Sequence, residues 1–145
     1  MDQGKFLNKE DKQRISEAIK AAELNTSGEI RVHVESAVNE DVLDRAAYIF
    51  KTLNMHKTTE RNGILFYLAQ ESRKFAILGD AGINAKVPAN FWDCVKENMA
   101  ANFADGKFAD GLCEGIQFAG DQLKAHFPYQ KDDINELTDE ISFGK

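Results

Sequence analysis

The chain has 145 residues, of which 43% are hydrophobic and 29% charged, and it contains only two prolines. This length and composition predict one packed globular domain rather than a disordered chain. The formal net charge of −6 argues against nucleic acid and anionic membrane surfaces as partners, because both attract positive charge. No stretch has the apolar length of a signal peptide or of a membrane span, which needs about 20 apolar residues. We therefore expect a cytoplasmic protein without membrane insertion.

The first expected elements are a helix over residues 9–24 and a strand from residue 30. Asn8 and Asp11 have the spacing of a helix cap with an acid in the first turn. Apolar residues then recur at helical spacing, at Ile15, Ala18, Ile19 and Ala22. Residues 25–28 break the helix, and residues 30–35 alternate strictly between apolar and polar side chains. This alternation predicts a strand with one solvent-exposed face, which places His33 at the surface.

The middle of the chain predicts a second helix followed by a hairpin. Asn39 is the expected cap of this helix. Its apolar stripe contains Val42, Ala46, Ile49, Phe50 and Leu53. Residues 64–69 are a continuous apolar run of strand length, which predicts a central strand covered on both faces. Residues 70–73 are short enough only for a hairpin turn, so residues 74–78 are expected to return antiparallel.

The last third of the chain predicts two helices and an acidic tail. Pro88 suits the first turn of the first helix, and Asp105 and Gly106 end it. The second helix begins near Phe108 and stops at Pro128. The tail, residues 129–145, is either a frayed terminus or a short amphipathic helix that carries Ile134, Leu137 and Ile141. The element order is α-β-α-β-β-α-α, which predicts an α/β fold: a three-layer αβα sandwich with a small mixed sheet, formed by residues 1–128.

Five stretches of the chain resemble the TPM domain family. They are residues 28–32, residues 61–65, residues 73–83, the pair Phe91 and Trp92, and residues 103–112. The resemblance covers about residues 8–128, and it is greatest to the stand-alone cytoplasmic bacterial form. It implies an αβα sandwich and, as in several members, a bound divalent cation in a surface groove, with calcium favoured over magnesium. Phosphatase activity is attributed to some members, but this chain offers no nucleophile motif for it.

Carboxylates far apart in the sequence are expected at one edge of the sheet. The first two strands are joined through a helix and should be parallel, while the third returns. This arrangement places Glu29 and Asp80 at one edge, and the turn at Asp105 is expected to reach it with Asp110. Carboxylates are the ligands that hard cations prefer, so we predict one metal site from these four residues. Each has a structural alternative, as a strand flank, a turn former, a helix cap or a first-turn acid.

Three further residues are expected beside this site. Arg61 either pairs with Asp80, or holds an anionic ligand, or is a solvated loop arginine. Asn62 follows it, and Trp92 is expected to form part of a groove wall. Two functions fit: a cation-binding interaction or regulatory module that a protein partner reads, and a metal-dependent phosphatase. The first is favoured, because the phosphatase also needs a positioned acid or base while every candidate carboxylate is already used as a ligand.

Overall fold

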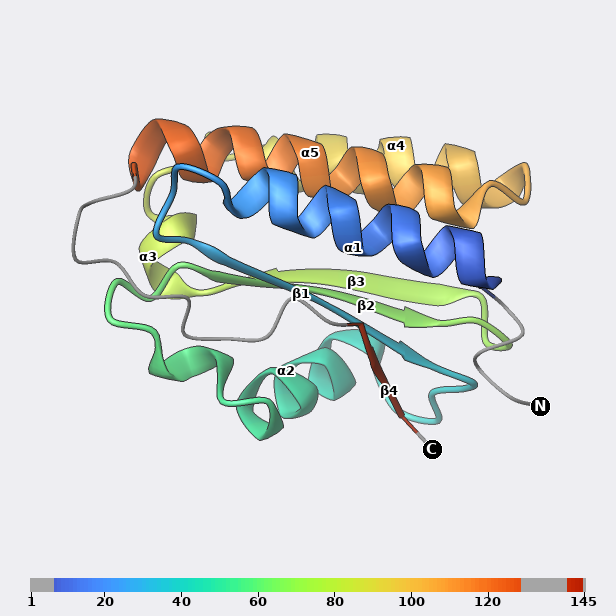
Figure 1. Cartoon of the computed structure of the whole chain (residues 1–145). Helices are drawn as coiled ribbons and strands as arrows, with labels where there is room; N and C mark the ends of the chain where they lie inside the picture. The colour runs from blue at the N-terminus through green and yellow to red at the C-terminus, as the bar shows by residue number, and fades with distance from the viewer. Residues whose placement is uncertain (1–6, 129–140, 145) are drawn as a thin grey trace.

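The computed structural model describes residues 7–128 and 141–144, and it forms three layers (Figure 1). Three helices cover one face of a four-stranded sheet and one helix covers the other (Figure 1). The first group is α1 (Lys9–Glu23), α4 (Phe91–Ala104) and α5 (Phe108–His126), and the opposite helix is α2 (Val42–Thr52). Two short helical turns are η2 (Met55–Lys57) and α3 (Ala81–Asn84). The predicted three-layer αβα sandwich is therefore confirmed.

The sheet has the order β3-β2-β1-β4. Its strands are β1 (Glu29–Glu35), β2 (Gly63–Ala69), β3 (Lys74–Gly79) and β4 (Ser142–Phe143). As predicted, β1 and β2 are parallel, and β3 returns antiparallel beside β2. Every residue of β2 is buried, which confirms the prediction of a central strand from its unbroken apolar run.

The end of the chain contains a strand that the sequence did not predict. Ser142 and Phe143 pair in parallel with His33 and Val34 of β1. Ile141, which precedes this strand, packs against the main core instead of lying on a helix. The other two residues assigned to a tail helix, at positions 134 and 137, lie outside the described residues. The strand alternative was missed because a two-residue strand leaves no periodicity to detect.

The prediction of a solvent-exposed face on β1 is wrong. Glu29 is 2% exposed, His33 6% and Glu35 3%. Alternation identified the polar face correctly, but other elements cover it: Tyr67 of β2 and Arg45 of α2 reach Glu35 with hydrogen bonds. Polar alternation along a strand indicates which side chains share a face, and it does not show whether that face meets water.

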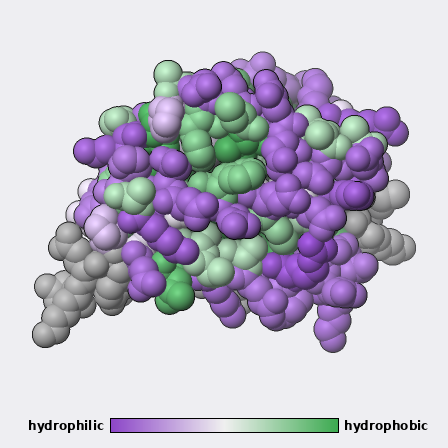
Figure 2. Space-filling view, turned by 90° about the horizontal axis from the view of Figure 1, so that it is seen from above, coloured by the Kyte–Doolittle hydropathy of each residue, from purple (hydrophilic) through white to green (hydrophobic). Residues whose placement is uncertain are grey.

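The two faces of the sheet have separate cores. The larger core lies under α1, α4 and α5, and it contains the alternate residues Ile30, Val32 and Val34 of β1. Helices α1 and α5 approach closely because Gly120 lies against Ala22, where an added Cβ atom would be only 2.6 Å from the Ala22 Cβ. Seen from above, hydrophobic side chains gather in the middle of this helical layer and hydrophilic ones surround them (Figure 2). Within residues 7–128 and 141–144, no helix is long and apolar enough to cross a membrane.

The capping groups at the helix starts confirm the prediction for α1 and correct the predictions for α2 and α4. Asn8 and Asp11 form the predicted capping box of α1. The cap of α2 is Asp41 rather than Asn39, because its carboxylate accepts from two N–H groups of the first turn. Helix α4 begins at Phe91, and Pro88 stands before it, with its carbonyl accepting from the Phe91 N–H group.

A glycine at the start of α3 gives a test of the packing at the sheet edge. A Cβ atom at Gly82 would overlap the carbonyl oxygen of Glu60 and lie 2.6 Å from that of Arg61. Both obstacles are backbone atoms, so we expect Gly82→Ala to lower the free energy of unfolding by about 3 kcal/mol. Gly106 has φ +75 and open space around it, so Gly106→Asn should cost less than about 1 kcal/mol. Urea unfolding measures both, and an equal or smaller cost at Gly82 would contradict the close approach.

Candidate functional site

The structure brings Glu29, Asn62 and Asp80 to one edge of the sheet, the one at which β1 and β2 begin and β3 ends. Glu29 pairs with Gly63, and the Asp80 N–H group donates to the Gly63 carbonyl at 2.9 Å. Glu29, Asn62 and Asp80 are 2%, 1% and 7% exposed. By strand alternation Glu29 and Gly63 face the side covered by α2 and η2. Asp80 follows β3 directly, as the cap of α3. Two buried carboxylates therefore flank a residue that has no side chain.

Arg61 is bound to Asp80, which is one of the three roles expected for it. Its Nε and Nη2 atoms lie 2.7 and 2.8 Å from the two carboxylate oxygens of Asp80. Asp80 also caps α3 by accepting from the Ala81 N–H group at 2.7 Å. The hydrogen bond to Asp80 raises the pKa of Arg61, so its guanidinium stays charged. The Arg61 side chain remains 53% exposed, whereas the carboxylate that it holds is buried.

Polar contacts connect the loops at this edge. The Asn62 Nδ2 atom donates to the Ser27 hydroxyl at 3.2 Å, and that hydroxyl donates to a Glu60 carboxylate oxygen at 3.1 Å. The Glu29 N–H group donates to the Asn62 carbonyl at 3.4 Å. Oxygen atoms of the chain segments before β1 and before β2 are thereby held close together.

Trp92 lies beside the same edge, where its indole contacts the segment that precedes Asp80. Its indole Nε1–H donates to the Asn84 side chain at 2.8 Å, and the Asn84 amide donates to the Gly79 carbonyl at 2.7 Å. Gly79 directly precedes Asp80 in the chain. The Trp92 ring is partly buried and meets Phe91 edge to face, at a centroid distance of 4.8 Å. The indole is thus linked to the Asp80 segment through one asparagine.

Asp105 and Asp110 do not join these residues, because their turn lies at the other end of the sheet. The α4–α5 turn stands over the β2–β3 hairpin, and α3 lies at the far end (Figure 1). Gly106 of the turn lines a groove together with Gln70 and Arg73 of the hairpin. The two ends are separated by the length of β2, which is about 20 Å for seven residues.

The length of α4 explains this separation. Its 14 residues extend about 21 Å, which carries the chain from the Trp92 end to the hairpin end. There Asp105 is the exposed C-cap of α4, and Asp110 pairs with Arg14 of α1 at 2.5 Å. The four predicted carboxylates therefore do not form one site. In the part of the chain that the structure describes, no three His, Cys, Asp or Glu residues are grouped so that they could hold a metal ion.

A second polar cluster, centred on Glu35, was not identified from the sequence. One carboxylate oxygen accepts from the Tyr67 hydroxyl at 2.6 Å and from the Arg45 Nε at 2.9 Å. The other accepts from the Arg45 Nη2 at 2.7 Å and lies 3.2 Å from the His33 Nε2. Burial raises the pKa of Glu35, but the hydrogen bonds from these three residues outweigh it and lower the pKa to about 2.

His33 connects the Glu35 cluster to the end of the chain. Its Nδ1 lies 2.7 Å from the Ser142 hydroxyl, and its ring stacks on Tyr67 at a centroid distance of 6.1 Å. Burial lowers the pKa of His33 despite the nearby Glu35 carboxylate. The sequence does show that His33 and Glu35 share one face of a strand. It does not show their partners from α2 and β4, because residues so far apart leave no local pattern.

The Glu35 cluster predicts a loss of stability in acid. Because the folded pKa of Glu35 is lowered from 4.5 to about 2, its contribution is present above pH 4.5 and is lost as the pH falls towards 2. This amounts to about 3 kcal/mol. The lowered pKa of His33 acts in the same direction, beginning below its ordinary value of 6.5.

Urea unfolding at several pH values measures this loss. We expect Glu35→Gln to show a smaller decline than the parent between pH 5 and pH 2, and the exposed Glu97→Gln control to follow the parent. Parallel declines in the parent and Glu35→Gln would show that the buried carboxylate is not held as described.

Known proteins resemble this chain in both sequence and fold. The family model of the TPM domain matches residues 1–122. The NMR structure of the BA42 protein from the psychrophilic bacterium Bizionia argentinensis has 47% identity and a TM-score of 0.88, covering 96% of both chains. No protein with a curated function matches.

Two more distant structures show the same fold. The N-terminal domain of cg2496 from Corynebacterium glutamicum has 14% identity and a TM-score of 0.66, covering 90% of this chain and 81% of that one. An N-terminal domain of a protein from P. gingivalis has 17% identity and a TM-score of 0.71, covering 89% and 85%. With the family match over residues 1–122 and the 47% identity to BA42, the chain belongs to the TPM domain family.

Proposed function

We propose that this domain binds a divalent cation at the sheet edge formed by Glu29, Asn62 and Asp80, and that a protein partner recognises the loaded edge. Calcium is the preferred ion in this proposal and the cytoplasm the expected location. The proposal keeps two of the four carboxylates predicted from the sequence and leaves out Asp105 and Asp110, which lie at the other end of the sheet.

The position of Gly63 is the observation that carries the proposal. Glu29 and Asp80 flank Gly63 in the sheet, and the Met55 carbonyl oxygen of η2 lies 3.1 Å from where a Gly63 Cβ atom would be. A carbonyl oxygen thus lies close to the glycine that the two carboxylate-bearing residues flank in the sheet, and Asn62 directly precedes this glycine. Calcium accepts such an irregular set of carboxylate and carbonyl oxygens, whereas magnesium requires near-octahedral geometry.

Arg61 is proposed to act as an exchangeable counter-ion. It neutralises Asp80 through two hydrogen bonds, yet more than half of its side chain is exposed. A cation that takes over the Asp80 carboxylate would release the guanidinium into water, where it is solvated at little cost. The released Arg61 and the ordered loops would then change the surface that a partner meets.

The partner is proposed to be a protein because apolar surface lies beside this edge. Leu24 follows α1 directly, three residues before Ser27, and it is 63% exposed. Trp92 adds a partly exposed indole near Asp80. Aromatic and aliphatic side chains next to a charged site are common at protein interfaces.

Calorimetric titration with Ca²⁺ tests the cation site. We expect Asp80→Asn and Glu29→Gln to weaken binding by about tenfold or more, because each removes a charged ligand but keeps its shape. Arg61→Gln should strengthen binding, because the cation no longer competes with the guanidinium. Asp105→Asn and Asp110→Asn serve as controls at the opposite end and should bind as the parent does. Unchanged affinity in Asp80→Asn would rule out the site, and melting curves of the metal-free variants show whether each remains folded.

The exposed guanidinium of Arg61 also favours a second candidate, a metal-dependent phosphatase. Guanidinium groups bind phosphoryl oxygens two at a time, so Arg61 beside a cation is suitably placed for a phosphate ester. We expect no hydrolysis of p-nitrophenyl phosphate with Ca²⁺, Mg²⁺ or Mn²⁺ beyond the protein-free rate. Turnover that Asp80→Asn and Arg61→Gln both abolish would reverse this ranking.

A further inference from the structure

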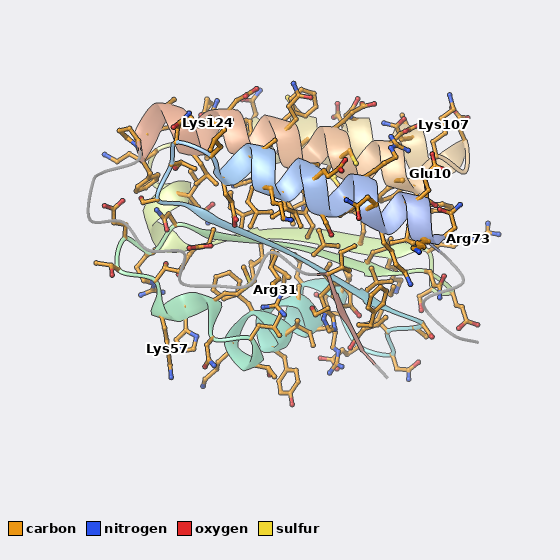
Figure 3. The ribbon with its side chains drawn as sticks, in the orientation of Figure 1. Glu10, Arg31, Lys57, Arg73, Lys107 and Lys124 are labelled. Carbon is orange, nitrogen blue, oxygen red and sulfur yellow. The ribbon has the colours of Figure 1, made fainter. Side chains whose placement is uncertain are left out.

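A groove at the hairpin end of the sheet is separate from the proposed cation edge. It has a volume of about 590 Å³ and lies between the β2–β3 hairpin and the α4–α5 turn. Arg73 stands at this end, below the turn that carries Lys107 (Figure 3). The lining residues are Leu68, Gln70, Arg73, Phe75, Ala100, Phe103, Ala104, Gly106 and Phe108. Its volume is in the range of sites that hold small organic ligands.

Three phenylalanine rings give the groove an apolar wall. Phe75 meets Phe103 edge to face at a centroid distance of 5.0 Å, and Phe103 stacks on Phe108 at 5.3 Å. All three rings are only partly buried. The neighbouring positions on α4, Ala100 and Ala104, carry small side chains that leave the space open. The rings therefore present an aromatic surface that a flat or aliphatic group can cover.

The polar side chains of the groove lining, Arg73 and Gln70, both carry hydrogen-bond donors. Arg73 is exposed and supplies the only charged side chain in the lining. Among the described residues, it forms no ion pair with a carboxylate. The Gln70 Nε2 atom is buried, and it has no hydrogen-bond partner among residues 7–128 and 141–144. A buried donor without an acceptor is unfavourable, and a ligand oxygen would remove that cost.

We propose that this groove binds a small amphipathic monocarboxylate, with its apolar body on Phe75, Phe103 and Phe108. The carboxylate is placed on the Arg73 guanidinium, whose planar donors match two carboxylate oxygens, and on the Gln70 amide. One cation in the lining selects a single negative charge, even though the whole chain carries −6. This site does not depend on the proposed cation edge, because the two lie at opposite ends of the sheet.

A matched pair of ligands tests the proposal on the full chain. The probes are 1-naphthaleneacetate and its uncharged amide, 1-naphthaleneacetamide, titrated by calorimetry. We expect one bound acetate per chain and about tenfold weaker binding of the amide. Arg73→Gln should remove the preference for the acetate, while Lys107→Gln, a nearby cation outside the lining, should keep it. Equal affinity for both probes in the parent, or no binding of either, would overturn the proposal.

Variants that fill the groove provide a second test of the same proposal. Ala104→Leu and Ala100→Leu place larger side chains at exposed positions of α4, so the core is left intact. Both variants should melt as the parent does and lose binding of the acetate and of the amide. Unchanged acetate affinity in both folded variants would show that the naphthalene ring binds elsewhere. Binding of an aromatic peptide through its side chains, without any dependence on Arg73, would identify a peptide surface instead.

Discussion

The buried charge of Glu35 is the constraint on how α2 packs against β1 and β2. Its carboxylate is only 3% exposed, and a charge taken out of water is tolerated only when it is fully paired. The pairing comes from three different elements: Arg45 of α2, Tyr67 of β2 and His33 of β1. Each partner must keep its position for the carboxylate to stay satisfied, so the network fixes α2 against the sheet in one orientation.

The two ends of the sheet carry different kinds of side chain. At the start of β1 and β2, buried oxygen-bearing side chains gather around Gly63. At the hairpin end, aromatic rings line an open groove together with Arg73 and Gln70, whose donors have no acceptor among the described residues that would neutralise or satisfy them. The helix α4 spans the distance between them and belongs to both, through Trp92 at its first turn and Phe103 near its last. A rigid element of this kind holds two surfaces at a constant separation.

Local sequence patterns predicted most of the fold, because each main element has a periodicity or a cap of its own. The capping box at Asn8 and the apolar run of β2 are examples in which neighbouring residues decide the outcome. The site was predicted only in part. Strand direction was enough to place Glu29 and Asp80 at one edge, whereas the position of Asp105 depended on the orientation of α4, which is set by packing. The Glu35 cluster depends on Arg45 and Tyr67, and no local pattern reveals such distant partners.

The short strand β4 has a consequence for the order in which the chain folds and opens. Ser142 meets His33 across 109 positions of sequence, and a strand of two residues offers few contacts in return for closing so long a loop. We expect contacts of this kind to form late, after β1, β2 and α2 have assembled. We expect the same contacts to be the first to separate in a local opening that leaves the main core intact. Without global unfolding, such an opening would expose the outer edge of β1 at His33 and Val34 and admit water to the buried carboxylate behind it.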